Sequence, residues 1–283
     1  MDGEAGCLWR LARGRSLSCR TPLVAGIVNV TPDSFYDGGR HPDTASAVAH
    51  GRKLAAEGAD MLDVGGESTR PGAATVSLAE EVGRVVPVIS ALVAAFPDIP
   101  VSVDTFKAGC ADAALEAGAV IVNDISAWAF DPPLLDVLVA RKPGYVLMHS
   151  QGRPETMQRA PQYGDVVEEI LAFFEDRLDR LVRAGLPEDR VVLDPGIGFG
   201  KRLEHNLAIL RRLDRFLTLG RPLYLGLSNK ALFGDLFGLP TEKRGDSTQV
   251  ATALAAAKGA RIHRVHDVAG AKRALRLAVE LAA

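Results

Sequence analysis

Eight apolar segments with the character of buried parallel strands recur along the chain at a steady spacing, and helical patterns separate them. The expected strands cover residues 23–29, 60–64, 99–104, 119–124, 144–149, 190–194, 222–228 and 260–266. Because no linker rich in proline or serine interrupts this succession, we expect an α/β fold, a single (β/α)8 TIM barrel. An open doubly wound sheet is the alternative, since periodicity by itself does not prove closure.

Each expected strand carries a polar side chain at or next to its carboxyl end, and these side chains are Asn29, Asp63, Asp104, Asn123, His149, Asp194, Ser228 and His266. In a barrel of parallel strands the carboxyl ends converge on one mouth, where such proteins build their active sites. Around an open sheet the same residues would be too scattered to share one site. The polar strand ends therefore favour the barrel and predict one active site at its mouth.

Composition excludes several classes of protein. The formal net charge is −2, so there is no general basic field for nucleic acid. No apolar segment approaches the roughly 20 residues of a membrane span, and the N-terminal arginines have no secretory apolar segment behind them. Three scattered cysteines without a CxxC pair predict reduced thiols in a cytoplasmic protein. We expect residues 1–22 to form a short antiparallel lead-in to a barrel of residues 23–283.

Three of the polar strand ends, Asp104, Asn123 and Asp194, are expected to be buried. Buried polar groups are costly unless they are hydrogen-bonded, so acceptors and amides that converge in an apolar barrel suit a flat heterocycle with N–H and amino donors. Lys230 is expected on the same side, where its ammonium can reach a ring carbonyl or a carboxylate. Phe199, on a glycine-flanked loop, can stack on a ring or anchor the loop in the core, and the sequence leaves both interpretations open.

Two segments favour an anionic ligand. The loop that follows the second strand contains paired glycines and Arg70, whose forked guanidinium suits a carboxylate or a phosphate. Strand alternation puts Arg264 and His266 on one face and His263 on the other, so Arg264 and His266 are expected to clamp an anion at the mouth. The alternative is that these two residues merely finish the strand.

Seven motifs, in order along the chain, closely resemble those of the dihydropteroate synthase family: GIVNVTPDSFYDGG (26–39), DVGGESTRPGA (63–73), SVDTFK (102–107), VNDIS (122–126), LMHSQGRPETMQ (147–158), DPGIGFGK (194–201) and RVHDV (264–268). The resemblance extends from about residue 23 to the C-terminus. It implies a pterin-binding (β/α)8 barrel that joins 6-hydroxymethyl-7,8-dihydropterin pyrophosphate to 4-aminobenzoate and releases pyrophosphate. It also implies a homodimer and a Mg2+ cofactor.

The resemblance assigns a role to each matching residue. The pterin would be held by Asp104, Asn123, Met148, Asp194 and Lys230. The pyrophosphate would be bound by Thr69, Arg264, His266 and Asn29, the last of which would also bind the Mg2+. The 4-aminobenzoate side would be formed by Thr69, Arg70, Pro71, Phe199 and Ser228. The residues expected to carry the catalysis are Asp104, Lys230, Arg264 and His266.

The chain departs from the family pattern at Asn229, where arginine is usual, and also at Tyr36, Ser150 and 127–129. Strand alternation predicts that the side chain of residue 229 points away from those of Ser228 and Lys230, so its loss of charge is expected to affect 4-aminobenzoate most. A folate–corrinoid methyltransferase and a non-catalytic pterin-binding protein are the alternative functions. The methyltransferase would have no use for the 4-aminobenzoate loop or the Arg264 and His266 pair. The non-catalytic protein would be distinguished by a broken ionic site, whereas this chain keeps Asn29, Lys230, Arg264 and His266.

Overall fold

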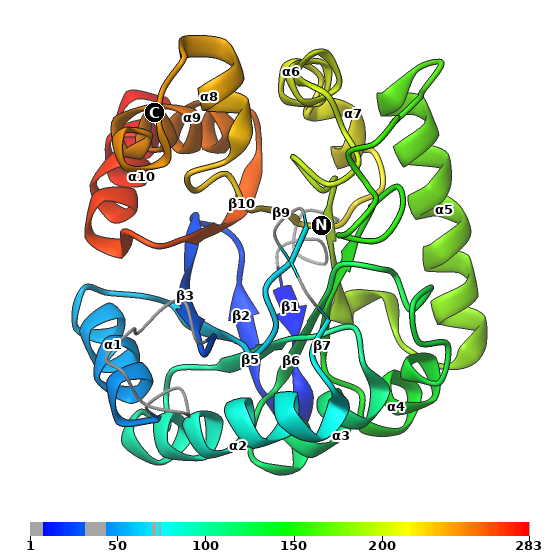
Figure 1. Cartoon of the computed structure of the whole chain (residues 1–283), viewed down its shortest axis with the longest axis vertical. Helices are drawn as coiled ribbons and strands as arrows, with labels where there is room; N and C mark the ends of the chain where they lie inside the picture. The colour runs from blue at the N-terminus through cyan, green and yellow to red at the C-terminus, as the bar shows by residue number, and fades with distance from the viewer. Residues whose placement is uncertain (1–7, 32–43, 70–71, 74, 283) are drawn as a thin grey trace.

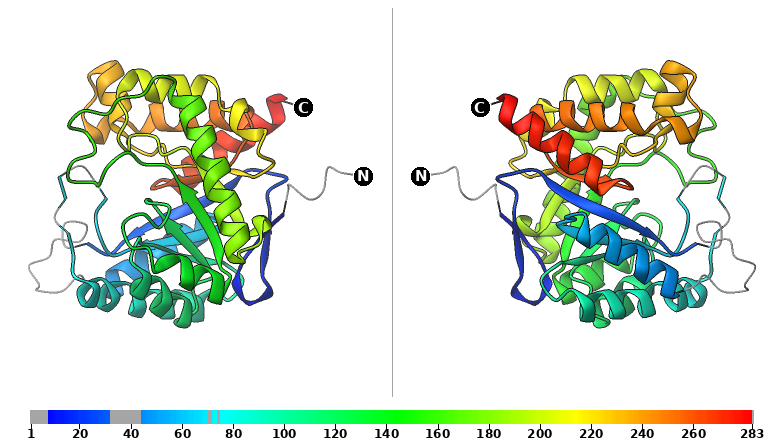
Figure 2. Two further views of the ribbon diagram at one scale, coloured as in Figure 1. Left: turned by 90° about the vertical axis from the view of Figure 1, so that its right-hand side faces the viewer. Right: turned by 90° about the vertical axis from the view of Figure 1, so that its left-hand side faces the viewer.

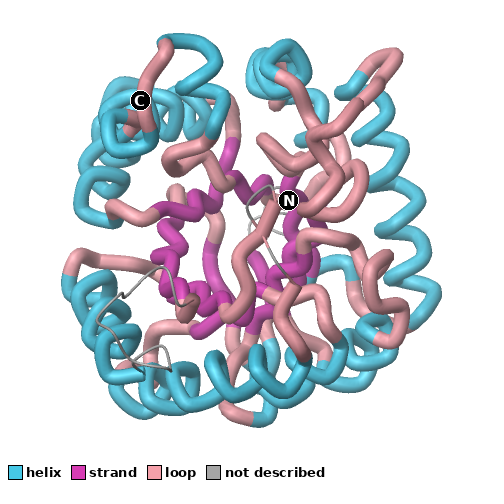
Figure 3. Tube along the Cα trace, in the orientation of Figure 1, coloured by secondary structure: helices cyan, strands magenta, loops and turns pink. Residues whose placement is uncertain are grey.

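The computed structural model describes residues 8–31, 44–69, 72–73 and 75–282, so Tyr36, Arg70 and Pro71 lie outside the described residues. Its centre is a closed barrel of parallel strands (Figures 1 and 3). In barrel order the strands are β10 (Ala260–Val265), β3 (Leu23–Asn29), β4 (Met61–Gly65), β5 (Val101–Asp104), β6 (Ile121–Asp124), β7 (Gly144–Met148), β8 (Val191–Asp194) and β9 (Leu223–Leu225). Because β10 pairs with both β3 and β9, the TIM-barrel prediction is confirmed and the open-sheet alternative is wrong.

Helices cover the outside of this barrel (Figure 1). They are α1 (Thr44–Ala56), α2 (Leu78–Ala95), α3 (Ala108–Glu116), α4 (Leu134–Arg141), α5 (Val166–Ala184), α6 (Leu203–Arg211), α7 (Asp214–Leu217), α8 (Ala231–Phe237), α9 (Gly245–Ala257) and α10 (Val268–Ala282). Local sequence sets several of their ends. Ser77 and Asp165 cap the amino ends of α2 and α5, and α5 stops at Gly185, whose φ of 109° favours glycine. No helix within the described ranges is both long and apolar enough to cross a membrane.

Apolar side chains fill the barrel interior near the amino ends of the strands, so a ligand can enter only at the mouth, where the carboxyl ends lie. Inward side chains near the amino ends of the strands form one apolar cluster, which includes Met61, Ile121 and Ile262. A hairpin of β1 (Leu8–Arg10) and β2 (Ser16–Ser18) covers this end, as Figure 2 shows. Its Trp9 is fully buried in the same cluster, and Trp9 Nε1 donates to Arg190 O at 2.8 Å. The strand carboxyl ends are therefore the open side of a packed core.

The end of β9 differs from the expectation and changes the account of position 229. The sequence predicted a strand over 222–228, but β9 stops at Leu225, and residues 228–229 form a turn. Asn229 has a φ of 56° in this turn, a left-handed conformation that asparagine tolerates better than most residues. The strand-alternation argument for residues 228–230 is therefore wrong, because alternation requires an extended backbone.

Candidate active site

The centre of the mouth is an ion network contributed by four strands. Arg264 from β10 lies between two carboxylates, with Nε donating to Asp63 Oδ2 at 2.6 Å and Nη2 donating to Asp104 Oδ2 at 2.6 Å. Asn123 Nδ2 donates to the same Oδ2 of Asp63 at 3.1 Å. Asp63 is fully buried, whereas Asp104 and Asn123 keep slight exposure towards the mouth. The network therefore orients Asp104 through Arg264 and Asn123 through Asp63, a residue to which the sequence assigned no individual role.

The charges in this network are strongly shaped by burial. Burial raises the pKa of Asp104 to about 7, against the lowering effect of the Arg264 guanidinium. Burial opposes the charge on Arg264, but the Asp104 and Asp63 carboxylates raise its pKa, so Arg264 stays a cation. Near neutral pH the Asp104 carboxyl therefore changes between its protonated form, which can donate a hydrogen bond, and its ionised form, which only accepts.

A second ionic group lies on the β8 and β9 side of the mouth. Burial raises the pKa of Asp194 to about 6, against the Gly196 N–H, which donates to Asp194 Oδ1 at 2.7 Å, and against Lys230. Desolvation lowers the pKa of Lys230 to about 8, although Asp194 favours the charged form. The Lys230 ammonium lies 4.1 Å from the centre of the Phe199 ring. The mouth therefore has an acid and a base whose pKa values lie near neutrality.

An apolar wall adjoins these ionisable groups. Phe106, Ile125 and Met148 form a small buried cluster, and the partly buried Phe130 and Phe199 pack against it. Phe199 therefore packs on the core and also faces Lys230, whereas its stacking on a ligand ring stays a prediction. A flat ring fits between such a wall and a set of buried acceptors.

The Arg264 and His266 side chains make their hydrogen bonds to different partners. Arg264 binds Asp63 and Asp104, whereas His266 Nδ1 lies 2.8 Å from Ser228 Oγ, which also accepts the His266 N–H at 3.3 Å. His263 is buried on the opposite face of the strand, as alternation predicts. Ser228 and His266 thus join the segments that follow β9 and β10 at the rim.

Asn29 and Thr69 lie on the β3 and β4 side. Asn29 ends β3 opposite Gly65 and is half-buried, and its side chain makes no hydrogen bond within the described part of the chain. Its amide oxygen is therefore available to a hard cation such as Mg2+, which commonly keeps several water or phosphate ligands. Across the described ranges no group of three or more His, Cys, Asp and Glu side chains forms a metal site.

The loop that carries Thr69 is tied to the barrel by a lysine that sequence reasoning missed. Lys107 Nζ donates to Glu67, to Val76 O at 2.6 Å and to Glu81 Oε2 at 2.6 Å. Burial opposes the charge of Lys107, but its bonds to Glu67 and Glu81 raise its pKa. Glu81 is only 1% exposed although it lies on α2, and a carboxylate on the buried face of a helix was the signal that a cation must lie nearby.

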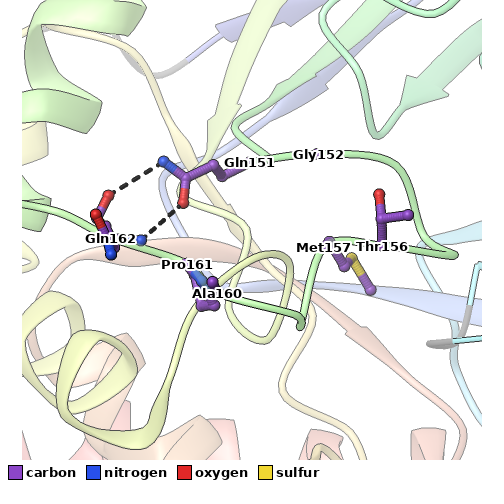
Figure 4. Close-up of a pocket in the computed structure, with 7 residues that line it drawn as sticks. All are labelled: Gln151, Gly152, Thr156, Met157, Ala160, Pro161 and Gln162. Atoms are coloured by element: carbon purple, nitrogen blue, oxygen red, sulfur yellow. Dashed lines mark hydrogen bonds between the residues drawn. The ribbon is translucent and has the colours of Figure 1, made fainter.

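A hollow of about 360 Å³ lies at the rim, within the loop between β7 and α5 (Figure 4). Gln151 and Gln162 close one side through two hydrogen bonds of 3.1 Å. The same loop reaches the mouth, where Gln158 Nε2 donates to Gly198 O at 2.7 Å. The hollow has no ionisable lining, and none of the expected site residues lines it. The ionisable side chains described above therefore gather at the mouth and not around this hollow.

Comparison with known proteins points to one family. Residues 25–266 match the family model for the pterin binding enzyme. The chain is 42% identical over 266 residues to the dihydropteroate synthase of Escherichia coli strain K12, covering 94% of each chain. It superimposes on Xanthomonas albilineans dihydropteroate synthase with 4-aminobenzoic acid with a TM-score of 0.90 and 46% identity, covering 97% of this chain and 98% of that chain. For the enzyme of the same organism in complex with 7,8-dihydropteroate the TM-score is 0.87 and the identity 43%, covering 97% and 99%.

Proposed function

This chain belongs to the dihydropteroate synthase family of pterin-binding enzymes, and we propose that it acts as the folate-biosynthesis transferase that joins 6-hydroxymethyl-7,8-dihydropterin pyrophosphate to 4-aminobenzoate. The products would be 7,8-dihydropteroate and pyrophosphate. The observation that carries this assignment is the set of buried hydrogen-bonding side chains, Asp104, Asn123 and Asp194, at the mouth of a barrel that matches the family over nearly its whole length. A methyltransferase or a non-catalytic binding protein is disfavoured because the relatives named above are dihydropteroate synthases.

The pterin ring binds to the buried acceptors. Asp104, Asn123 and Asp194 face ring N–H and amino groups, and Lys230 donates to a ring carbonyl or nitrogen. Met148 and its apolar neighbours form one wall. Ring donors replace the water that these side chains would otherwise need, so the ring binds in one orientation.

The pyrophosphate leaves as the carbon–oxygen bond breaks, and the bonding electrons go to the pyrophosphate oxygen. Positive charge develops on the pterin methylene, where the carboxylates of Asp104 and Asp194 stabilise it. Arg264 and His266, with the hydroxyl of Thr69, stabilise the departing anion. The amine of 4-aminobenzoate then attacks the methylene carbon and releases a proton. Cleavage before attack makes this dissociative, SN1-like chemistry.

The residues present fit a Mg2+ ion at the pyrophosphate side. Asn29 would hold the ion through its free amide oxygen, and bound Mg2+ supplies positive charge to the leaving group.

The 4-aminobenzoate lies on the Ser228 side of the mouth, between Phe199 and the loop of Thr69. The contributions of Arg70 and Pro71 to this subsite rest on the family resemblance, because both lie outside the described residues. Asn229 lacks the positive charge usual at that position.

A homodimer is favoured by exposed apolar side chains on three neighbouring helices. Within the described part of the chain these include Leu236 and Phe237 on α8, Val250 and Leu254 on α9, and Leu277 on α10. These helices lie together on one side of the barrel (Figure 1). An apolar patch that is exposed in a single protein chain commonly marks an interface with another chain. Sedimentation should show a dimer for the wild type and a monomer for the double variant that combines Val250→Glu and Leu254→Glu. A monomeric wild type would contradict the proposed dimer.

A cytoplasmic location is supported by thiols. Cys110 is a reduced and fully buried thiol, as expected where thiols stay reduced. Cell fractionation tests this location.

The function is tested by pyrophosphate release from purified protein, with and without 4-aminobenzoate, together with detection of dihydropteroate. We expect one dihydropteroate for each pyrophosphate when both substrates are present. Asp104→Ala should abolish product formation, whereas replacement of the exposed Asp176 of α5 by alanine should leave it unchanged. Pyrophosphate release without product in the presence of 4-aminobenzoate would contradict the assignment.

A further inference from the structure

The turn at Ser228–Lys230 is held in shape by Thr248 on α9 and by Arg244 just before that helix, which the sequence gave no reason to link to the site. We propose that Thr248 and Arg244 are positioning residues that fix this turn and thereby set the geometry of both substrate subsites. This inference rests on the proposed function, because Ser228 and Lys230 are the substrate-contacting residues through which it acts.

Both peptide groups of Asn229 are bound by residues at the start of α9 or just before it. The Asn229 N–H donates to Thr248 Oγ1 at 3.1 Å, and Arg244 Nη1 donates to Asn229 O at 3.1 Å. Arg244 Nε also donates to Leu239 O at 3.0 Å, so one guanidinium joins the segments before and after α8. The Thr248 hydroxyl donates to Arg244 O at 2.8 Å, which leaves the Thr248 oxygen oriented as the acceptor for Asn229.

The turn needs this external support. Asn229 has a φ of 56°, a conformation that costs free energy for any residue with a side chain. The hydrogen bond within the turn, from Lys230 N–H to Leu227 O, is long at 3.3 Å. A strained turn with a weak internal bond persists only when its surroundings stabilise it. Thr248, which is 2% exposed, provides such surroundings because it is itself locked in the core.

Movement of the turn would disturb two contacts at once. Lys230 would leave its position 4.1 Å from the Phe199 ring, and Ser228 Oγ would leave His266 Nδ1, which is 2.8 Å away. The first contact lies on the pterin side, and the second joins Ser228 on the 4-aminobenzoate side to His266 on the pyrophosphate side. Loss of the Thr248 hydroxyl should therefore lower kcat/KM for both substrates, whereas loss of a side chain that contacts one substrate directly should lower kcat/KM mainly for that substrate.

Thr248→Val tests this directly, because valine has the shape of threonine without the acceptor for the Asn229 N–H. Thr248→Ser keeps the acceptor. Thr252→Val is the matched control, since Thr252 is 1% exposed, lies one turn further along α9 and has no hydrogen bond to residues 228–230. The carbonyl of Arg244 remains paired in every variant, because it also accepts the Thr248 N–H at 2.9 Å.

We expect Thr248→Val to lower kcat/KM about tenfold for each substrate, the effect of one lost buried hydrogen-bond partner. Thr248→Ser should restore most of it, and Thr252→Val should leave it unchanged even if it lowers the melting temperature equally. Equal kinetic losses in Thr248→Val and Thr252→Val, or no rescue by serine, would overturn the inference.

Hydrogen exchange at the Asn229 amide separates this inference from the proposed function. Exchange should be faster in Thr248→Val than in wild type or Thr252→Val, whatever reaction the protein catalyses. Unchanged exchange would overturn the positioning role, whereas a wild type that forms no dihydropteroate would overturn only the proposed function. If Thr248→Val does not fold, Arg244→Lys applies the same test from the carbonyl side, because it removes the paired donors while keeping the charge.

Discussion

Replacement of Asp63 by asparagine should destabilise the protein strongly, because Asp63 is the fully buried partner of a cation. Asp63 Oδ2 accepts from Arg264 Nε at 2.6 Å and from Asn123 Nδ2 at 3.1 Å. Removal of one partner from a buried ion pair costs about 3–5 kcal/mol, since the remaining charge is left uncompensated. Arg264 keeps Asp104, and the asparagine oxygen still accepts a hydrogen bond. We therefore expect the lower end of this range, about 3 kcal/mol.

Urea unfolding at pH 8 measures this loss, with Asp112→Asn as the matched control. Asp112 also accepts from an arginine Nε, that of Arg141 at 2.7 Å, but these side chains are 42% and 44% exposed. Solvent screens such a pair, so the control should unfold at nearly the wild-type urea concentration. Equal losses in the two variants would refute the reasoning, because burial would then not decide the strength of the contact.

The same variant should change the pH dependence of stability. Asp104 binds its proton more tightly in the folded protein than in the unfolded chain, so stability falls as pH rises from 3.8 to about 7. The charge of Asp63 contributes to this raised pKa, so Asp63→Asn should lower the pKa of Asp104 and make the fall smaller. The urea series repeated between pH 5 and pH 8 checks this, and an unchanged slope would show that Asp63 does not act on Asp104.

Three further predictions concern the substrates. Lys230 has a pKa of about 8, so pterin binding measured by calorimetry should weaken as pH rises through 8, and Lys230→Met should abolish that dependence. Asn229→Arg should lower the KM for 4-aminobenzoate and leave the KM for the pterin pyrophosphate unchanged. The melting temperature should fall slightly, because arginine is strained at a φ of 56°. A change confined to the KM for the pterin pyrophosphate would contradict this prediction. Lys107→Met should raise the KM for 4-aminobenzoate, because it releases Glu67 and Val76 in the loop of Thr69, and Lys107→Arg should partly restore it. Steady-state kinetics measures both variants, and an unchanged KM in Lys107→Met would exclude a role of Lys107 in positioning this loop.

The sequence by itself determined the elements and the side of the barrel on which the chemistry lies. Apolar runs predicted every strand of the barrel, and the strand at 23–29 matches its observed bounds. Capping residues predicted where helices begin, as at Ser77. Asp104, Asn123 and Asp194 were expected at one mouth because parallel strands all point the same way. These features are encoded locally, by period and by neighbouring residues, so a single sequence reveals them.

Only the tertiary structure decided which side chains are partners. Arg264 meets Asp63 and Asp104, which precede it by 201 and 160 residues, and no local pattern specifies that pairing. Strand alternation was applied to residues 228–230 because the expected strand extended to Ser228, whereas the conformation of the turn at Asn229 is set by Thr248 on α9 and by Arg244 just before that helix. Barrel closure brings such residues together, and the cost of leaving a buried charge or peptide group unpaired then selects the arrangement. That selection acts through space, so it leaves no periodic signal in the sequence.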